Sequence, residues 1–472
     1  MKTKLMAVTL AALSAGACTV GPNYERPQVA QPDAFRSQIA PAEANSLADL
    51  PWWEVFNDPA LQALIGEALT NNNDLAVAAA RIEQARAQLG VSRSELYPQI
   101  GYGGQAGVEE TLVPSPGNTI GTVNYGSIGG LLNAAWELDI WGRVRRQNEA
   151  AQANLFAQEE VRRGIMLSLV SDVAAGYFRL LRLDRELAIA EESAATHKRT
   201  LDLFVLRFQG GRDSRLPSER ARASYESSTG QIAHVQQQIA QQENALSILT
   251  GGYPHDIQRG LPLTSQTLPA TPVGLTTDLL RRRPDIRRAE QDMIRANAEV
   301  GVAVANFYPR IGLSSLLGAF GVDGDGNING SFGVWNILGQ LAGPIFTGGR
   351  LESQYDERKA FWDETIAQYR QTILVAFRET SDALVAQQRL AERRRALEAE
   401  VAARRAAVEL ANLRYRDGRA TYFEVIEAEQ QLFPAEDALA EVQQAQLAET
   451  VNLYKALGGG WQLRDNWVRP TG

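Results

Sequence analysis

The amino-acid sequence predicts an α+β membrane protein built from one structural unit used twice, with long coiled-coil helices and four β-strands per chain. Three observations support this prediction. The sequence repeats itself, two long segments lack helix breakers, and each half carries a pair of segments with alternating side chains. After residue 18 no apolar run reaches the roughly 18 residues that a membrane-spanning helix needs, so a spanning part would have to be a β-barrel.

The repeat is visible as motifs that return in order. Tyr97-Pro98-Gln99-Ile100-Gly101 returns as Tyr308-Pro309-Arg310-Ile311-Gly312, and 308 minus 97 gives a displacement of 211 residues. Leu206-Arg207-Phe208 returns in the same way as Leu413-Arg414-Tyr415. A duplicated unit predicts two similar halves of one body. The predicted organisation is a signal peptide at 1–17, an anchor segment at 18–57, a first repeat at 58–252, a linker at 253–275, a second repeat at 276–460 and a tail at 461–472.

Each half contains two segments with the period of a β-strand. Residues 100–112 and 133–140 alternate apolar with small or polar side chains, and residues 311–322 and 331–346 correspond to them in the second half. Residues 114–118 and 324–327 between them have turn composition. Four strands cannot close a barrel, because the smallest known barrels have about eight. The sequence therefore predicts an oligomer that shares one barrel, and three chains of four strands would supply twelve.

The rest of the chain is predicted to be helical. Residues 142–210 lack proline, and residues 350–417 lack both proline and glycine. At about 1.5 Å per residue each helix would be on the order of 100 Å long. Heptad-like seams end both segments and predict coiled-coil hairpins with the helices that follow, although Arg394 and Arg404 interrupt the second seam. Shorter helices are expected at 59–96, 217–249, 276–307 and 422–457.

The N-terminus has the features of an export signal. Lys2 and Lys4 precede an apolar stretch, and small residues lead to Cys18, the single cysteine of the chain. Bacterial lipoprotein signals end in this way, and lipidation removes the oddity of an unpaired thiol in an exported protein. We expect Cys18 to carry a covalent lipid, with ordinary signal cleavage beside it as the alternative. Thr19 favours sorting to the outer membrane.

Several other classes of function lack support in the sequence. The net charge of −8 gives no basic footprint for nucleic acid. No nucleophile-elbow or P-loop motif is present, and the three histidines are scattered, so neither an enzyme, a cofactor nor a metal site is expected. Residues 323–329 resemble the start of a calcium loop, but Val334 stands where a closing glutamate belongs, which favours a hairpin turn.

Motifs throughout the mature chain resemble one family. The lipobox-like start, Asn57-Asp58-Pro59, Trp136-Glu137-Leu138-Asp139, Arg282-Arg283-Pro284-Asp285-Ile286 and Gly348-Gly349-Arg350 are similar to those of the OprM and NodT lipoprotein branch of TolC-type outer-membrane factors. The resemblance implies a homotrimer with a twelve-stranded barrel in outer-membrane lipid and a twelve-helix α-barrel across the periplasm. It also implies a passive exit duct, docked through a periplasmic adaptor, or membrane fusion protein, to an inner-membrane RND transporter.

The same resemblance implies where the duct closes and docks. In this family the periplasmic helix tips close the pore, and here those tips are the turns at 210–217 and 417–421. Phe423 and Glu427 are four residues apart on one helix face and are the candidates for constriction rings, although family members carry an aliphatic residue and an aspartate there. Arg414 and Tyr415 are candidates to latch the closed state. The adaptor-docking candidates are Gly211, Arg212, Leu216, Gly418 and Arg419.

Two alternatives to drug efflux stay open at this point. A duct for type I protein secretion has the same architecture, and the sequence separates it poorly from an efflux channel. A lipid-anchored coiled-coil scaffold without a pore would explain the heptads and Cys18, but not the paired alternating strands. The compounds exported and the partner proteins are not encoded in this chain.

Overall fold

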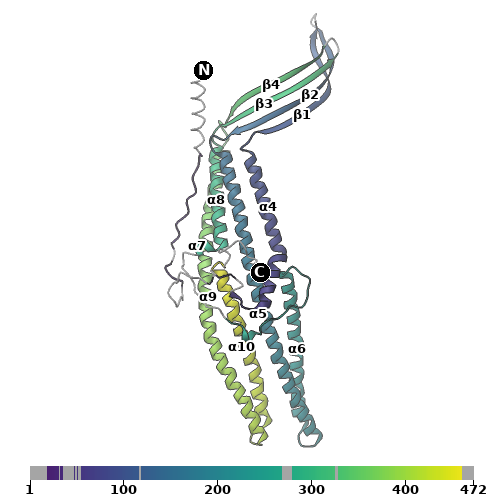
Figure 1. The fold of residues 1–472 in the computed structure, drawn as a ribbon, viewed down its shortest axis with the longest axis vertical. Coiled ribbons are helices and arrows are strands. Elements are labelled where there is room, and N and C mark those ends of the chain that lie inside the picture. The colour runs from purple at the N-terminus through teal and green to yellow at the C-terminus, as the bar shows by residue number, and fades with distance from the viewer. Residues whose placement is uncertain are drawn as a thin grey trace. The chain divides into compact units, whose positions relative to one another are not determined.

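The computed structural model describes residues 19–30, 32–35, 47, 50–51, 55–115, 119–267, 279–324 and 328–459 (Figure 1). They form two compact units. The first contains Met1–Gln28, Arg81–Glu159 and Arg288–Arg370, and the second contains Val29–Ala80, Glu160–Arg287 and Gln371–Gly472. Each unit draws on both halves of the chain, so the duplication contributes to both. Cys18, the predicted signal peptide and the predicted C-terminal tail lie outside the described residues.

The first unit contains one antiparallel sheet in the order β1-β2-β3-β4. The strands are β1 (Gln99–Ser115), β2 (Thr119–Leu138), β3 (Arg310–Gly324) and β4 (Ile328–Ala342). Four strands per chain were predicted and are confirmed, and the sheet is curved in Figure 1. Two boundaries were wrong: β2 begins well before residue 133, and β4 ends before Pro344, which has no N–H for the ladder. The turn residues 116–118 and 325–327 lie outside the described residues.

The two faces of this sheet differ in chemistry. The strand register pairs Tyr102 with Leu132, Leu132 with Leu317, and Leu317 with Trp335, which places these four side chains in one row on one face. Between the levels of Ile128 and Leu138 that face carries no charged residue. Ten residues of strand at about 3.4 Å each, tilted by about 45°, span about 25 Å, the height of the apolar band of an outer-membrane barrel.

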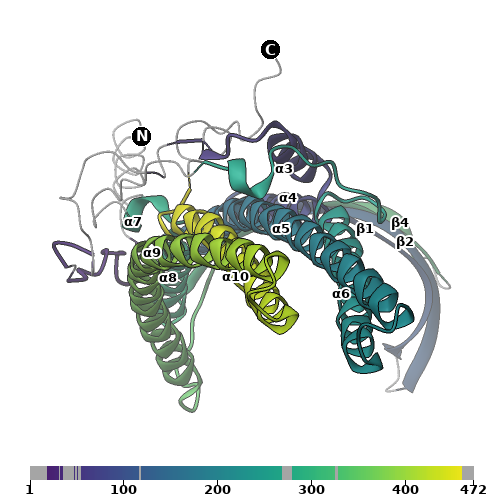
Figure 2. The same cartoon turned by 90° about the horizontal axis from the view of Figure 1, so that it is seen from below.

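The long helices of the two repeats are equal in length. Helix α5 (Arg143–Gln209) and helix α9 (Arg350–Arg416) have 67 residues each, which corresponds to about 100 Å as predicted. The helices that follow them, α6 (Arg215–Leu249) and α10 (Tyr422–Ala456), have 35 residues each. Figure 2 shows α5 with α6 and α9 with α10 as two pairs seen nearly end-on. We call the first pair hairpin 1 and the second pair hairpin 2.

The predicted seams hold these hairpins together in two different ways. In hairpin 1, Leu201, Phe204 and Ala221 form a small buried apolar cluster. In hairpin 2 the arginines that interrupt the heptads bridge the helices: Arg394 Nη1 donates to Gln446 Oε1 at 3.2 Å, and Arg404 Nη1 donates to Gln431 Oε1 at 2.6 Å. Polar seam positions are therefore satisfied by hydrogen bonds across the hairpin.

The shorter helices are interrupted where the sequence predicted continuous ones. The segment at 59–96 divides into α3 (Pro59–Asn71) and α4 (Asn73–Ser94), and the segment at 276–307 into α7 (Leu279–Arg282) and α8 (Pro284–Ala305). At the first break Asn72 has extended backbone, and its Oδ1 accepts from the N–H groups of Asp74 and Leu75. An asparagine at an N-cap stabilises the new helix start, which the prediction missed.

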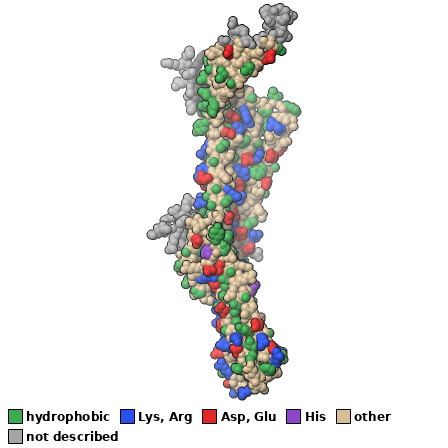
Figure 3. Space-filling view, turned by 90° about the vertical axis from the view of Figure 1, so that its right-hand side faces the viewer, with side chains coloured by type: hydrophobic (Ala, Val, Ile, Leu, Met, Phe, Trp, Pro, Cys, Tyr) green, Lys and Arg blue, Asp and Glu red, His purple; other side chains and the backbone are tan. Residues whose placement is uncertain are grey.

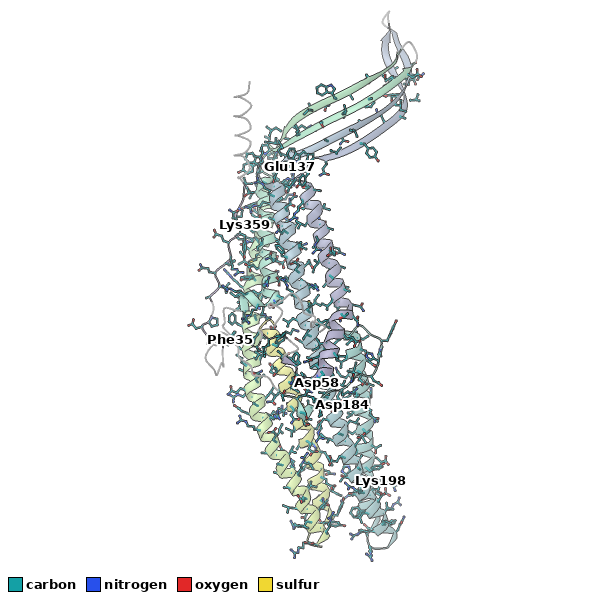
Figure 4. The ribbon with its side chains drawn as sticks, in the orientation of Figure 1. Phe35, Asp58, Glu137, Asp184, Lys198 and Lys359 are labelled. Carbon is teal, nitrogen blue, oxygen red and sulfur yellow. The ribbon has the colours of Figure 1, made fainter. Side chains whose placement is uncertain are left out.

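The main core of the second unit is fastened to the linker through a buried carboxylate. Asp58 caps α3 by accepting from Ala60 N at 2.9 Å and is fully buried. Its Oδ2 also accepts from Tyr177 Oη at 3.1 Å, Leu261 N at 3.1 Å and Gln266 Nε2 at 2.7 Å. Burial raises the pKa of the Tyr177 hydroxyl, which keeps it a neutral donor. Figure 4 labels Asp58 at this junction, so the Asn57-Asp58-Pro59 motif has a structural role.

One described helix passes a length and hydropathy criterion for crossing a membrane. Helix α5 contains an 18-residue window of mean hydropathy 1.4, and 61% of that window is buried inside the chain. Core helices pass the same criterion. Because α5 contributes Val170, Val173 and Tyr177 to the main core of the second unit, its apolar stretch is explained by packing.

Candidate functional site

The two hairpin turns have the same backbone geometry. Gly211 and Gly418 adopt φ of +66° and +70°, a left-handed conformation that glycine accepts without strain. Arg212 N donates to Arg207 O at 2.9 Å, and Arg419 N donates to Arg414 O at 2.8 Å. These are the hydrogen bonds of the Schellman motif, which ends both helices in the same way. The glycines are thus required by the turn itself.

Arg414, a predicted latch residue, stays within its own hairpin. Its Nη1 lies 3.4 Å from Glu424 Oε2, and its Nη2 donates to Arg419 O at 3.5 Å. Both partners lie just across the turn from α9. Within the chain, Arg414 therefore stabilises the end of hairpin 2 and does not reach hairpin 1.

Tyr415 does connect the two hairpins. Arg207 Nη1, at the end of α5, donates to Tyr415 Oη at 2.7 Å, and Arg207 Nε lies 2.6 Å from Asp213 Oδ2 in the first turn. A planar guanidinium can serve both partners at once because its donors form a fixed fork. Arg207 is the sequence equivalent of Arg414, yet it bonds to the opposite hairpin.

A second contact joins the hairpins about two helical turns earlier on α5. The hydroxyls of Thr200 and Tyr422 are hydrogen-bonded, and the Tyr422 ring packs edge-on against Phe204 at 4.7 Å and against Tyr415 at 5.0 Å. Burial raises the pKa of Tyr422 to about 12. Its phenol is therefore neutral at physiological pH. We call Arg207, Tyr415, Thr200 and Tyr422 the tip latch.

Phe423 and Glu427 point away from the hairpin core. The Phe423 side chain is 63% exposed and Glu427 is also exposed, whereas Val425 on the same helix is fully buried. A large exposed aromatic residue beside an exposed carboxylate is not explained by packing within this chain. Figure 3 shows acidic and basic side chains gathered around this end of the molecule.

The docking candidates are exposed at the same tips. Arg212, Leu216, Arg419 and both turn glycines are exposed. The predicted turn at 210–217 is too long, because α6 begins at Arg215 and so includes Leu216. Pro217 does not prevent this, since a proline in the first helical turn has no intrahelical N–H bond to lose.

A cavity of about 660 Å³ separates the hairpins next to the tip latch. It is lined by α5, α6 and α10, and His197 lies in its wall with Nδ1 2.8 Å from Ser228 Oγ. Burial lowers the pKa of His197, because the charged imidazolium loses hydration. Glu186 and Asp437 also line the cavity, and burial raises the pKa of Asp437.

An N-terminal strap, residues 19–26, fixes the chain next to the base of the sheet. Val20 N donates to Trp141 O at 3.0 Å, and Asn297 Nδ2 donates to Pro22 O at 3.1 Å. Arg26 Nε donates to Glu290 Oε1 at 2.6 Å. The strap therefore ties the residue after Cys18 to the junction between β2 and α5.

The sequence analysis named Tyr415, with Arg414, as a latch candidate, and it did not name Arg207, Thr200 or Tyr422. Arg207 could have been singled out, since Leu206-Arg207-Phe208 and Leu413-Arg414-Tyr415 are repeats of one motif. Thr200 and Tyr422 carry no comparable signal. A threonine on a coiled-coil stripe and a tyrosine at a helix start are common, and only the fold brings them together.

The sheet, the paired long hairpins and the tip turns define an outer-membrane channel, and comparison gives its family. The family model described as outer membrane efflux protein matches residues 64–252 and 275–459. The cation efflux system protein CusC of Escherichia coli O6:H1 is 33% identical over 455 residues, covering 96% of this chain and 97% of CusC. The probable efflux pump outer membrane protein TtgC of Pseudomonas putida KT2440 is 34% identical over 471 residues, covering 98% and 96%.

Solved structures agree with this assignment. The open-state MtrE outer membrane channel of Neisseria gonorrhoeae has a TM-score of 0.82 at 33% identity and covers 94% of this chain and 98% of its own. The CmeC outer membrane channel of Campylobacter jejuni has a TM-score of 0.84 at 27% identity, covering 94% and 95%. The chain therefore belongs to the outer membrane efflux protein family and has the TolC-like fold. It is an outer-membrane efflux channel, from a family of ducts and not of enzymes.

Proposed function

We propose that three copies of this chain form one duct that carries drugs or other small molecules from a tripartite RND-type pump across the periplasm and outer membrane. The single observation that carries this proposal is the sheet: one face carries an uncharged band between the levels of Ile128 and Leu138, and the order β1-β2-β3-β4 leaves β1 and β4 as edges within the described chain. Open edges are not tolerated in hydrocarbon. Pairing β4 of one copy with β1 of the next removes them.

The lipid on Cys18 is part of the same proposal. The strap places Thr19 against Gly142, at the base of the apolar band, where a Cβ on Gly142 would overlap Thr19. A lipid on the preceding residue would then begin at the level of the membrane interface. No cofactor is required for passive conduction.

We place the gate at the helix tips. The tip latch would hold hairpin 1 and hairpin 2 of each chain together, and three copies of Phe423 and Glu427 would line the narrowest passage. A ring of three carboxylates would admit cations more readily than anions. A periplasmic adaptor that docks on Arg212, Leu216, Arg419 and the turn glycines would pull the hairpins apart and open the duct.

Conductance tests the pore and the gate together. We expect low conductance from the purified protein in planar bilayers and a sharp rise for the Phe423→Ala, Glu427→Ala double variant. Equal conductance of the wild-type protein and the double variant would show that the gate lies elsewhere. Channel activity from neither protein would favour the lipid-anchored scaffold.

The cargo is tested in cells. Relatives are named for the efflux of cations, toluene and antibiotics, so this chain's cargo is proposed at the level of small molecules. Deletion of the gene should sensitise the cells to such compounds, and the wild-type gene should restore resistance. Unchanged sensitivity together with retention of a secreted protein would show a type I secretion duct.

A further inference from the structure

Helix α9 leaves uncovered a face that its counterpart α5 buries. The two hairpins match residue for residue, since 350 minus 143 and 422 minus 215 both give a displacement of 207. Four α5 residues on the side toward hairpin 2 are buried: Ser193, His197, Thr200 and Phe204. Their four α9 counterparts are partly or fully exposed: Glu400, Arg404, Ala407 and Ala411.

The cover on α5 comes from α10 of the same chain. The Phe433 ring lies edge-on against His197, with ring centroids 6.0 Å apart, and Tyr422 packs against Phe204. Figure 2 shows α9 and α6 on the two outer sides of the four helices. Above the turns the hairpins therefore meet through α5 and α10, and we call this contact the inner joint.

Helix α6 leaves uncovered the face that corresponds to the contact face of α10. Glu226 is the counterpart of Phe433, and Arg215 is the counterpart of Tyr422. Both α6 residues are exposed, whereas both α10 residues are partly buried. A duplicated unit can use one joint twice, and head-to-tail contacts between copies close into a ring when the rotation allows it. The uncovered faces of α9 and α6 are thus the two halves of a second joint.

One charged residue stands out on the α6 half. Four α10 residues line the cavity at the inner joint, and their α6 counterparts are Ala223, Glu226, Ser227 and Gly230. Among these four positions Glu226 alone carries a charge. A carboxylate at the centre of a joint calls for a cationic partner on the opposite face.

The α9 half supplies that partner. Arg404 is the counterpart of His197, and Glu226 is the counterpart of the Phe433 ring that lies against His197. Repetition of the joint therefore places the two charged residues opposite one another. A guanidinium has five N–H donors, and Glu400 and Gln431 take three of those of Arg404. Arg404 can therefore pair with a further carboxylate.

From this repetition we infer that α9 of one copy packs against α6 of the next copy, with Arg404 facing Glu226 across the joint. The inference rests on the proposed function, because it takes three copies as one ring. Strand order agrees with the direction, since β4 leads into α9 and the proposed function pairs β4 with the next copy's β1. The ring would alternate three inner joints, fastened by the tip latch, with three joints fastened by an ion pair.

The test is chemical cross-linking of the full-length protein in detergent, with pairs of introduced cysteines joined by a short bis-maleimide. We expect the Arg404→Cys, Glu226→Cys variant to shift from monomer to dimer and trimer bands on denaturing gels. Gln237 is exposed on the same face of α6, and 237 minus 226 gives eleven residues, or about 16 Å. The control pair Arg404→Cys, Gln237→Cys should therefore stay monomeric. Each single variant should do so too, which excludes reaction through Cys18, the single native cysteine.

Charge reversal tests the ion pair itself. Glu226→Lys would place two cations in the joint and should lower the temperature at which the trimer separates into monomers on heating. Glu226→Gln removes the attraction without adding repulsion, so it should lower this temperature less. An unchanged dissociation temperature in Glu226→Lys would overturn the pairing of Arg404 with Glu226.

The molar mass of the detergent-extracted protein, measured by light scattering, separates the two proposals. A trimer without cross-linked bands from the Arg404→Cys, Glu226→Cys variant would overturn the joint and leave the duct. Equal bands from the control pair would do the same. A monomeric wild-type protein would overturn the shared barrel of the proposed function, and the joint with it.

Discussion

The ends of the two hairpins have the same backbone and different side-chain partners. Arg207 and Arg414 occupy equivalent positions before equivalent Schellman turns. Arg207 bonds to Tyr415 of the other hairpin, whereas Arg414 pairs with Glu424 beside it. The comparison shows that duplication preserved the turn, which the backbone requires, while the side chains diverged. We infer that the contact between hairpins depends on the first repeat's arginine.

The largest expected effect comes from removing the Arg207 side chain of the tip latch, which tests this asymmetry directly. Arg207→Ala should raise planar-bilayer conductance at least tenfold, because a hydrogen bond from a charged donor is worth about 1.5–3 kcal/mol and 1.4 kcal/mol is a factor of ten. Arg414→Ala is the matched control and should stay within about twofold. Equal effects of the two substitutions would contradict the asymmetry.

The turns themselves should respond equally. Gly211→Ala and Gly418→Ala each place a Cβ in a left-handed conformation and should each lower stability by about 1 kcal/mol. Neither Cβ would meet another atom within 4 Å, so backbone strain is the whole expected cost. The thermal midpoints of the extracted protein measure this. A much larger loss at one glycine would show that the two turns are not equivalent.

A smaller expected effect is a difference between the seams of the two hairpins in how stability depends on pH. His197 in hairpin 1 and Arg404 in hairpin 2 hold equivalent seam positions. Because burial lowers the pKa of His197, the unfolded chain takes up a proton near pH 6.5 while the folded chain stays neutral. Stability should therefore fall as pH falls from about 6.5 toward the lower folded pKa. His197→Gln should flatten thermal midpoints between pH 7 and pH 5.

The smallest expected effect is at the exposed pair in hairpin 2. Arg414 and Glu424 are both more than a third exposed, and such pairs contribute about 0–1 kcal/mol. Glu424→Gln should therefore change the thermal midpoint by no more than a degree or two. A clear loss of stability, or a rise in conductance, would show that this pair has a role like that of Arg207.

The architecture could be predicted from the sequence because it is determined by the periodicity of the apolar side chains and by the positions of residues that end helices and strands. The four strands, the two long helices and the glycine-ended tips follow from alternating side chains, the absence of proline and positions that need left-handed backbone. Helix breaks at Asn72 and Arg283 were missed, since caps inside an otherwise helical stretch are weak local signals. The end of β4 could have been predicted from Pro344.

The candidate site was predicted less completely for a physical reason. Tyr415, Phe423 and Glu427 were named because they lie beside a turn that the family resemblance implies to be the gate. The tip latch joins residues more than 200 apart in the chain, and the hydrogen bond from Arg207 to Tyr415 depends on how the two hairpins meet. A pattern within a short stretch of sequence cannot show a contact between residues so far apart in the chain. The pairing of Phe320 with Phe332 was also not predicted, because it depends on strand register.

The most direct test of the central claim, that hairpin contact at the tip controls the pore, is a double-mutant cycle in planar bilayers with Arg207→Ala, Tyr415→Phe and the combined variant. If the two residues act as one latch, the combined variant should conduct no more than Arg207→Ala alone, because the same hydrogen bond is removed. Conductance gains that simply multiply, or that are absent from all three variants, would contradict a latch between these two hairpins.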